Sequence, residues 1–215
     1  DYCYVLDAMC HKDLGGVFQV AIGGGEPLEH PDFLQIIDET INRKIIPNFT
    51  TNGIHLSQDI CMAIRGKVGA VALSISSIKE LMRDSIDMLV GNGIRTNIHY
   101  VLSQKNIDEA IEILRGRYNV LFEGINAIIF LTYKPAGRAV KSFVLQKSNS
   151  FLQFLKLIND DKLPHPNIGF DACFVPMLMH YTDIRKELID TCEGGFFSVY
   201  IDHKMNVSPC SFSGN

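Results

Sequence analysis

The sequence contains no apolar run as long as a membrane-spanning helix, which needs about 20 residues. Its apolar runs, such as VGAVALSIS and INAIIFLTY, have the length of β-strands. It also lacks a basic cluster, since the formal net charge is -4 and Lys and Arg are spread among acidic residues. Proteins that bind nucleic acid concentrate positive charge on one surface, so we expect neither a nucleic-acid partner nor a membrane partner. No secretory signal is recognisable at Asp1, and we expect a cytoplasmic protein.

Cysteine is scarce, because six residues in 215 are too few for a disulfide scaffold. In a reducing cytosol these cysteines are buried thiols, metal ligands or reactive groups. Cys61 lies on the apolar face of an expected helix, and we interpret it as a core residue. The apolar fraction is 47%, which is enough for the core of one α/β domain, alone or with a small appendage.

Strand-like and helix-like segments alternate along the chain. The expected strands are Val17–Ile22, Ile45–Thr50, Ala70–Ser76, Ile94–Leu102 and Ile125–Tyr133. The expected helices are Asp32–Arg43, Ser57–Arg65, Ile78–Val90, Asn106–Arg117 and Ser150–Asp160. The strands recur at intervals of roughly 25 to 30 residues, about the length of a βαβ unit, which predicts a parallel sheet with right-handed crossovers.

The expected strands alternate apolar and polar residues, whereas a parallel strand buried on both faces is apolar on both. In IRTNIHYVLS, for example, Ile94 and Ile98 oppose Asn97 and His99. We infer a barrel-like curved sheet whose polar face lines a cavity; polar edge positions on an open sheet are the alternative. Ligands of such folds bind at the carboxyl ends of the strands. The segments GGGEP, TTNG, SISS and LTYKPAGR fall at these ends.

The segment GGGEP, residues 23–27, follows the first expected strand. It is not a phosphate-binding P-loop, because no Gly-Lys-Ser/Thr follows, and the GxGxxG spacing of dinucleotide sites also fails. Glycine lets a ligand approach the main chain closely. Backbone carbonyl oxygens and the carboxylate of Glu26 all accept hydrogen bonds, which suits an ammonium group. The segment therefore predicts a ligand that is cationic at this point, with a purely structural glycine turn as the alternative.

The alternation of strands and helices ends after the last expected helix. FFSVYI and MNVSP predict a short β-hairpin flanked by Cys192 and Cys210, and Cys173 is a third candidate ligand. Two or three such thiolates suit an Fe–S or zinc site, with unrelated buried thiols as the alternative. We expect a barrel domain over residues 1–162 and a small Cys-bearing module over residues 163–215.

Three segments in this order, GGGEPLEHPDF, FTTNGIHLS and LTYKPAGRA, resemble segments of the radical S-adenosylmethionine (SAM) enzymes. The resemblance covers residues 1–139 and implies a partial (β/α)6 TIM-like barrel. It implies that Gly24, Gly25 and Glu26 bind the amino group of SAM. The further SAM-binding residues that it implies are Ser74, Ser76, Asn97 and the backbone of Tyr133.

The hallmark of that family is a Cys-x-x-x-Cys-x-aromatic-Cys loop, whose thiolates hold a 4Fe-4S cluster with one iron open to SAM. The pair Tyr2-Cys3 resembles the end of this loop. The resemblance thus implies that Cys3 is a cluster ligand, and that two more cysteines and the first strand lie upstream of Asp1.

The C-terminal hairpin resembles the auxiliary-cluster module of the SPASM/twitch subgroup. The resemblance implies that Cys173, Cys192 and Cys210 bind an auxiliary Fe–S cluster. Met205 stands where that module normally has a glycine.

The resemblance implies an enzyme whose reduced cluster cleaves SAM to a 5′-deoxyadenosyl radical that abstracts hydrogen from a substrate. It also implies a peptide or protein substrate modified after translation, and an electron donor such as flavodoxin or ferredoxin. Two alternatives stay open: a non-catalytic peptide-binding module on the same barrel, and an Fe–S-independent barrel lyase or isomerase. The second requires a lysine or paired carboxylates at the strand ends, where the sequence offers Glu26 and Lys134.

Overall fold

The computed structural model describes residues 1–10, 16–136, 139–159 and 167–213. The chain divides into two compact units. Unit 1 comprises Asp1–Tyr100 and Tyr118–Ile129, and unit 2 comprises Val101–Arg117 and Phe130–Asn215. The expected boundary at residues 162 and 163 lies outside the described residues and stays a prediction.

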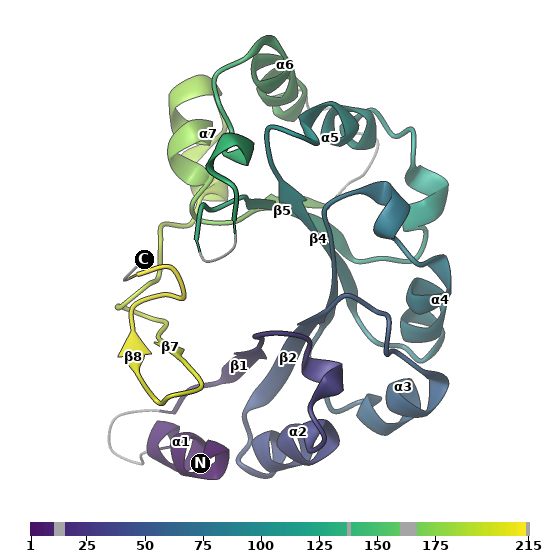
Figure 1. Cartoon of the computed structure of the whole chain (residues 1–215), viewed down its shortest axis with the longest axis vertical. Helices are drawn as coiled ribbons and strands as arrows, with labels where there is room; N and C mark the ends of the chain where they lie inside the picture. The colour runs from purple at the N-terminus through teal and green to yellow at the C-terminus, as the bar shows by residue number, and fades with distance from the viewer. Residues whose placement is uncertain (11–15, 137–138, 160–166, 214–215) are drawn as a thin grey trace. The chain divides into compact units, whose positions relative to one another are not determined.

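Figure 1 shows the elements in chain order. The strands of the large sheet are β1 (Gln19–Ile22), β2 (Ile46–Thr51), β3 (Val71–Ile75), β4 (Thr96–Leu102), β5 (Ala127–Thr132) and β6 (Ile168–Phe170). The helices are α1 (Tyr2–Met9), α2 (Phe33–Asn42), α3 (Gln58–Ile64), α4 (Arg83–Gly91), α5 (Ile107–Leu114), α6 (Asn149–Ile158) and α7 (Val175–Tyr181). The 3-10 turns are η1 (Pro27–Glu29), η2 (Ile78–Glu80), η3 (Asn119–Phe122), η4 (Lys141–Phe143) and η5 (Lys186–Leu188). The C-terminal hairpin consists of β7 (Tyr200–Ile201) and β8 (Val207–Ser208).

Six parallel strands alternate with helices in the order β1 to β6, and this is the α/β partial-barrel fold that the sequence predicts. The registers of the first four strands place Ala21 opposite Asn48 and Ser74 opposite His99. The five expected strands are all present. The strand β6 comes from the segment that the sequence analysis assigned to the C-terminal module. The small antiparallel hairpin β7–β8 is also confirmed.

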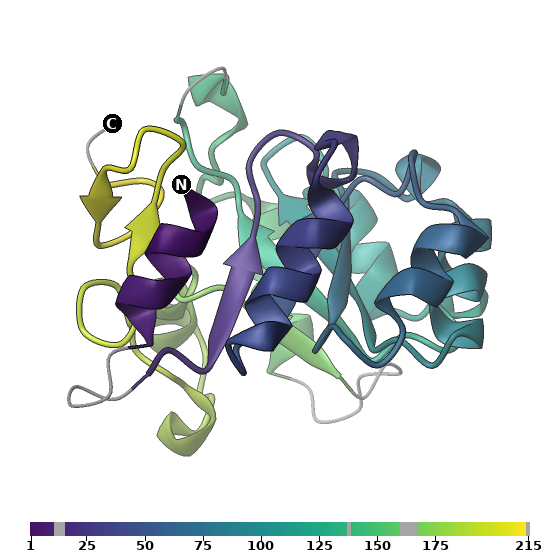
Figure 2. The same ribbon diagram turned by 90° about the horizontal axis from the view of Figure 1, so that it is seen from below.

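The strands of unit 1 have one buried and one less buried face. Along β4, buried residues alternate with half-buried ones, and Asn97 and His99 are in the half-buried set. Phe49 of β2 is 2% exposed, and its ring packs edge-on against Phe33 of α2 with centroids 5.0 Å apart. Burial of such a ring contributes about 1.5 to 3 kcal/mol. The apolar face of β2 therefore packs on its helix (Figures 1 and 2), and a cavity on the polar face stays a prediction.

Serine side chains fix two of the helix starts. Ser57 accepts a hydrogen bond from the Ile60 amide at the start of α3, and Ser148 accepts one from the Phe151 amide at the start of α6. Each such cap contributes about 1 kcal/mol. These caps satisfy amides that have no partner inside the helix.

The single helix expected at Ile78–Val90 is instead two elements, η2 and α4. Leu81 and Met82 between them have extended backbones. The reason lies in the preceding strand end, because the carboxylate of Glu80 accepts hydrogen bonds from the amide and hydroxyl of Ser76. The first turn thus closes on β3 and does not continue into α4.

Aromatic residues form the core of unit 2. Phe130 of β5, Phe154 of α6 and Phe174 are 0% exposed. Phe130 and Phe154 meet edge-on at 5.3 Å, and Phe170 of β6 stacks on Phe174 at 5.0 Å between centroids. Because β6 brings Phe170 into this cluster, the short strand is held by side-chain packing as well as by its pairing in the sheet.

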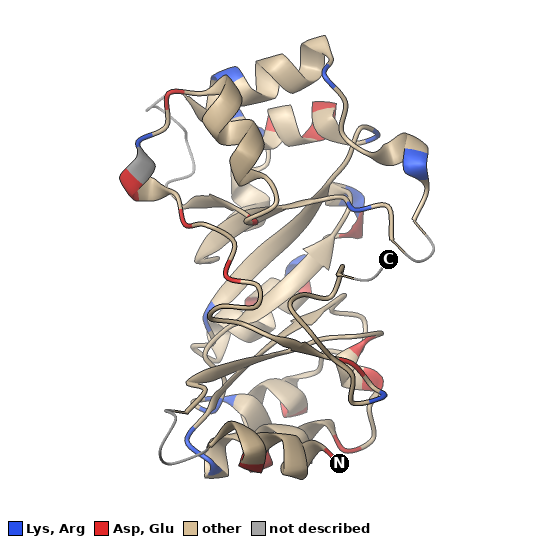
Figure 3. Cartoon of the chain, turned by 90° about the vertical axis from the view of Figure 1, so that its left-hand side faces the viewer, with Lys and Arg blue, Asp and Glu red and all other residues tan. Residues whose placement is uncertain are grey.

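The placement of charged residues and the hydropathy of the helices agree with the expectations from the sequence. Figure 3 shows Lys and Arg interspersed with Asp and Glu over the described elements. Among the described residues, no helix combines the length and the hydropathy that a membrane span requires. Gly137 and Arg138 of the LTYKPAGRA segment lie outside the described residues.

Candidate functional site

The glycine turn after β1 exposes its main chain. Gly24 has φ +91° and Gly25 has φ +51°, a region in which a residue with a Cβ is strained. No atom lies within 4 Å of a Cβ built on Gly23, Gly24 or Gly25. The glycines are therefore not there to avoid a neighbouring part of the protein. They leave open space above the backbone in which a ligand can contact the peptide groups directly.

Glu26 joins this turn to the end of β2. Its Oε1 accepts hydrogen bonds from the Thr51 hydroxyl at 2.6 Å and from the Leu28 amide at 3.3 Å. Its Oε2 accepts one from the Asn52 amide at 2.7 Å. A carboxylate has about four acceptor positions, so most of the capacity of Glu26 is used within the protein.

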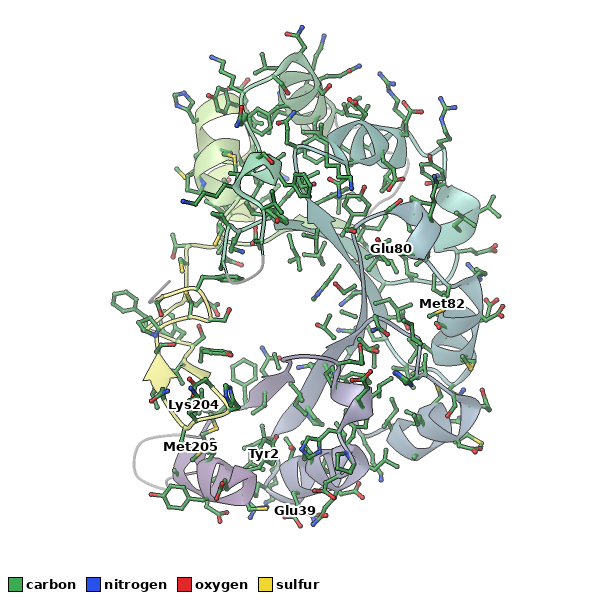
Figure 4. All side chains as sticks on the ribbon, viewed as in Figure 1. Tyr2, Glu39, Glu80, Met82, Lys204 and Met205 are labelled. Carbon is green, nitrogen blue, oxygen red and sulfur yellow. The ribbon has the colours of Figure 1, made fainter. Side chains whose placement is uncertain are left out.

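Ser74 and Ser76 lie at the carboxyl end of β3, as predicted. Ser74 is half-buried, whereas Ser76 is exposed and donates its amide and hydroxyl to the Glu80 carboxylate at 2.6 and 2.8 Å. Glu80 is labelled in Figure 4, beyond the end of β3. The sequence analysis missed it, although a glutamate four residues after a serine at a strand end is a recognisable signal.

Asn97 and His99 lie on the half-buried face of β4. The Oδ1 of Asn97 accepts a hydrogen bond from Nδ2 of Asn126 at 2.9 Å. The Nδ1 of His99 is 3.5 Å from the hydroxyl oxygen of Thr50 on β2. Burial lowers the pKa of His99, because the charged imidazolium loses hydration, and this keeps the ring neutral at pH 7.

Unit 2 carries an ion pair at the carboxyl ends of β5 and β6. The Nζ of Lys134 donates to Oδ2 of Asp171 at 2.6 Å, and the Thr132 hydroxyl donates to Oδ1 at 2.6 Å. The side chains of Lys134 and Asp171 are only 19% and 15% exposed. Lys134 also lies over the ring of Phe212, 4.5 Å from its centroid. Asp171 escaped the sequence analysis because β6, which it directly follows, was not recognised.

Tyr133 lies between Thr132 and Lys134 and is half-buried. Its amide donates to the Leu102 carbonyl at 2.9 Å, which extends the pairing of β5 with β4. Its hydroxyl accepts a hydrogen bond from the Val140 amide at 2.7 Å. Both ends of this residue are therefore fixed within unit 2.

The predicted metal ligands Cys3, Cys173, Cys192 and Cys210 are all exposed. In the described ranges, no three His, Cys, Asp or Glu side chains are grouped as a metal site. The segments that carry Cys192 and Cys210 nevertheless lie close together at Gly194. A Cβ built on Gly194 would lie 3.4 Å from Sγ of Cys192 and 3.1 Å from the carbonyl oxygen of Pro209, which precedes Cys210. Cys61 is 0% exposed, which confirms its interpretation as a core residue.

The hairpin turn contains a residue in a conformation typical of glycine. Met205 has φ +66°, and Figure 4 shows it next to Lys204 on the loop between β7 and β8. The carboxylate of Asp202 accepts hydrogen bonds from the amides of Lys204 and Asn206 at 2.8 and 2.9 Å. Hydrogen bonds from Asn206 lower the pKa of Asp202, since they stabilise the ionised form. The turn thus forms around a methionine at the position where the resemblance expects glycine.

Neither a protein-family model nor a curated protein sequence matches the chain. Solved structures do share its fold. Streptococcus suis SuiB bound to S-adenosylmethionine matches with a TM-score of 0.68 and 17% identity, over 93% of this chain and 51% of SuiB. SuiB bound to its precursor peptide SuiA gives a TM-score of 0.65 and 16% identity, over 91% of this chain and 49% of SuiB. The protein anSMEcpe with bound AdoMet and a Kp18Cys peptide gives a TM-score of 0.66 and 16% identity, over 100% of this chain and 66% of anSMEcpe.

The chain therefore has the length of about half of SuiB and two thirds of anSMEcpe. At identities of 16 to 17%, the likeness is one of fold. It is nonetheless a fold found in proteins whose structures contain SAM and peptides.

Proposed function

We propose that the chain is the barrel of a radical SAM enzyme, which binds SAM at the carboxyl ends of its strands and modifies a peptide or protein. The observation that carries this proposal is the open glycine turn, residues 23–25, at the end of β1. Structures of similar fold that contain SAM, a peptide or both support the ligand and the substrate class.

The glycine turn suits the methionyl end of SAM. An ammonium group has three donors and needs acceptors. The open space beside the turn lets such a group approach the main chain, next to the carboxylate of Glu26. We assign the ribose or the carboxylate of the ligand to Ser74 on β3, Ser76 directly after it and Asn97 on β4. The contact of the Tyr133 backbone with the adenine, which the resemblance implies, concerns unit 2 and stays a prediction.

The described residues do not by themselves fit a 4Fe-4S cluster. Such a cluster requires three thiolates in this family, and of these Cys3 alone is present in α1. Its side chain is exposed and so open to a metal. We therefore base the proposal on the SAM site and assign no step of the reaction to a cluster held by this chain alone.

We further propose that Cys192 and Cys210 bind an auxiliary metal centre of the SPASM/twitch type, with Cys173 as a third ligand. The Sγ of Cys192 and the carbonyl oxygen of Pro209, which precedes Cys210, both lie within 3.4 Å of a Cβ built on Gly194, and this supports the pairing of the first two. We also propose that the protein is cytoplasmic and receives electrons from a flavodoxin or ferredoxin; its exposed cysteine side chains suit a reducing compartment.

The test is isothermal calorimetry of SAM with the wild-type protein and with two glycine variants. Gly24→Ala introduces a Cβ at φ +91° in the proposed site, and Gly66→Ala introduces one at φ +71° in a turn beyond α3. Both positions have open space around the new Cβ, so each variant carries similar backbone strain of about 1 to 2 kcal/mol. Only Gly24→Ala should weaken SAM binding, and we expect a loss of at least tenfold.

Anaerobic reconstitution of the full-length gene product with iron and sulfide separates an enzyme from a binding module. An enzyme should bind SAM and give a reducible paramagnetic cluster whose spectrum changes on addition of SAM. SAM binding without any iron would favour the non-catalytic peptide-binding alternative. Absence of SAM binding to the full-length protein would reject the proposed function.

A further inference from the structure

An aromatic ring lies against the ammonium group of Lys134, just after the carboxyl end of β5. The Nζ of Lys134 is 4.5 Å from the centroid of the Phe212 ring. It is also 2.6 Å from Oδ2 of Asp171, which directly follows β6. These residues all belong to unit 2, and they lie at strand ends of the kind where ligands of barrel-like α/β folds bind.

We propose that Lys134 is a subsite for an aromatic side chain of the peptide substrate, and that Phe212 occupies this subsite in the free protein. Asp171 positions the ammonium group, and a substrate ring displaces Phe212 from it. The inference rests on the proposed function, because it needs a peptide substrate. It adds to that function a preference for one class of residue in the peptide.

The first argument is that the cation is desolvated and fixed. The side chains of Lys134 and Asp171 are only 19% and 15% exposed, so the ammonium group has lost much of its water. A cation attracts an aromatic ring more strongly when it is desolvated. Asp171 is itself held in place, since its amide donates to the Phe130 carbonyl at 3.1 Å and its Oδ1 accepts the Thr132 hydroxyl at 2.6 Å. The cation therefore needs little reorganisation before it binds a ring.

The second argument comes from two other lysines of unit 2 that lie over rings. The Nζ of Lys105 is 5.4 Å from the centroid of Phe143. The Nζ of Lys147 is 5.7 Å from the centroid of Tyr181. Both of these lysines are exposed, and a longer contact in water is weak. The contact of Lys134 is both shorter and less exposed, which sets it apart from an ordinary surface contact.

The third argument is that Phe212 can leave its place at low cost. Its side chain is 45% exposed, whereas the core ring of Phe130 is 0% exposed. Phe212 lies in a short turn that is closed by hydrogen bonds of the Ser213 amide and hydroxyl to the Cys210 carbonyl, at 3.2 and 2.7 Å. Rotation of the Phe212 side chain breaks neither of these bonds. The ring is therefore placed as a displaceable occupant of the site.

The test uses two capped tripeptides, acetyl-Gly-Phe-Gly-amide and the same peptide with cyclohexylalanine in place of Phe. Cyclohexylalanine has a similar shape but no π-electrons, so the ratio of the two dissociation constants isolates the attraction between ring and cation. Both peptides are titrated into the protein and followed by NMR. Phe212→Ala vacates the subsite, and Phe196→Ala is the control, since Phe196 is an exposed ring on the turn before β7.

We expect Phe212→Ala to bind the Phe peptide roughly threefold to tenfold more tightly than the wild type, and to prefer it over the cyclohexylalanine peptide by a similar factor. Phe196→Ala should leave both affinities at the wild-type values. Lys134→Met combined with Asp171→Asn, in the Phe212→Ala background, removes the cation without leaving an unpaired charge. This variant should bind the two peptides equally, and Lys134→Arg in the same background should keep the preference.

A Phe212→Ala variant that binds neither peptide, or binds both no better than the wild type, would overturn the inference and leave Phe212 as a structural contact. A preference that survives the loss of Lys134 would overturn it as well. SAM is titrated into the same samples. Protein that binds SAM but shows no preference for the Phe peptide refutes the inference alone, whereas protein that binds no SAM rejects the proposed function, and the inference with it.

Discussion

The ion pair of Lys134 and Asp171 provides a quantitative test of how the strand ends of unit 2 are held. Asp171→Asn removes the charge but keeps an oxygen that can accept the hydroxyl of Thr132. The variant therefore isolates the ion pair from the neighbouring hydrogen bond. Lys134 would retain its contact with the ring of Phe212, which is worth about 0.5 to 1 kcal/mol.

The expected cost follows from burial. Removal of one partner of a fully buried pair costs about 3 to 5 kcal/mol, and an exposed pair contributes about 0 to 1 kcal/mol. With side chains 19% and 15% exposed, Lys134 and Asp171 lie near the buried limit but keep some contact with water. We expect Asp171→Asn to lower the free energy of unfolding by about 2 to 3 kcal/mol.

The matched control is the pair of Lys67 and Asp38, which has the same N–O distance of 2.6 Å but side chains 41% and 52% exposed. Asp38→Asn should therefore cost less than about 1 kcal/mol. Urea denaturation followed by circular dichroism measures both changes. Equal costs for the two variants, or a cost below about 0.5 kcal/mol for Asp171→Asn, would refute the reasoning from burial.

Three further predictions concern the strand face, the hairpin and the cysteines. Because burial lowers the pKa of His99, the unfolded chain binds its proton more readily as the pH falls through about 6.5, and the protein loses stability there. Urea denaturation at neutral and mildly acidic pH should show this loss in the wild type and a smaller one in His99→Asn; equal losses would contradict it. Met205→Gly should relieve the positive φ, stabilise the hairpin by about 1 kcal/mol and slow hydrogen exchange of its amides, whereas faster exchange would count against it. Cys192→Ser and Cys210→Ser should each lower the iron or zinc content of anaerobically purified protein, while the buried control Cys61→Ser should not. The same metal content in all three variants would exclude the auxiliary site.

The sequence predicts the strands of the sheet well because their polar and apolar residues alternate with a period of two. In β4, for instance, the residues expected to face the helices are buried, and Asn97 and His99 are half-buried. The strand β6 could not be predicted in this way, because three residues between short turns are too few to show a period. Its place depends on Phe170, which packs in an aromatic cluster drawn from distant parts of unit 2.

The residues of the candidate site, like the strands, could be predicted from the sequence only in part. The glycine turn is evident from residues 23–25 alone, because three consecutive glycines have few structural uses. The connection between Glu26 and Thr51 is not evident, since it depends on the parallel pairing of β1 with β2, whose ends lie about 4.8 Å apart. Asp171 was missed for a related reason, because its partner Lys134 is distant in sequence and the strand before it was not recognised.

The most direct measurement of the central claim is a crystal structure of the protein with SAM. The account predicts the amino nitrogen of SAM within about 3 Å of a hydrogen-bond acceptor in residues 23–26. SAM bound away from the strand ends, or with its amino group far from the glycine turn, would contradict it.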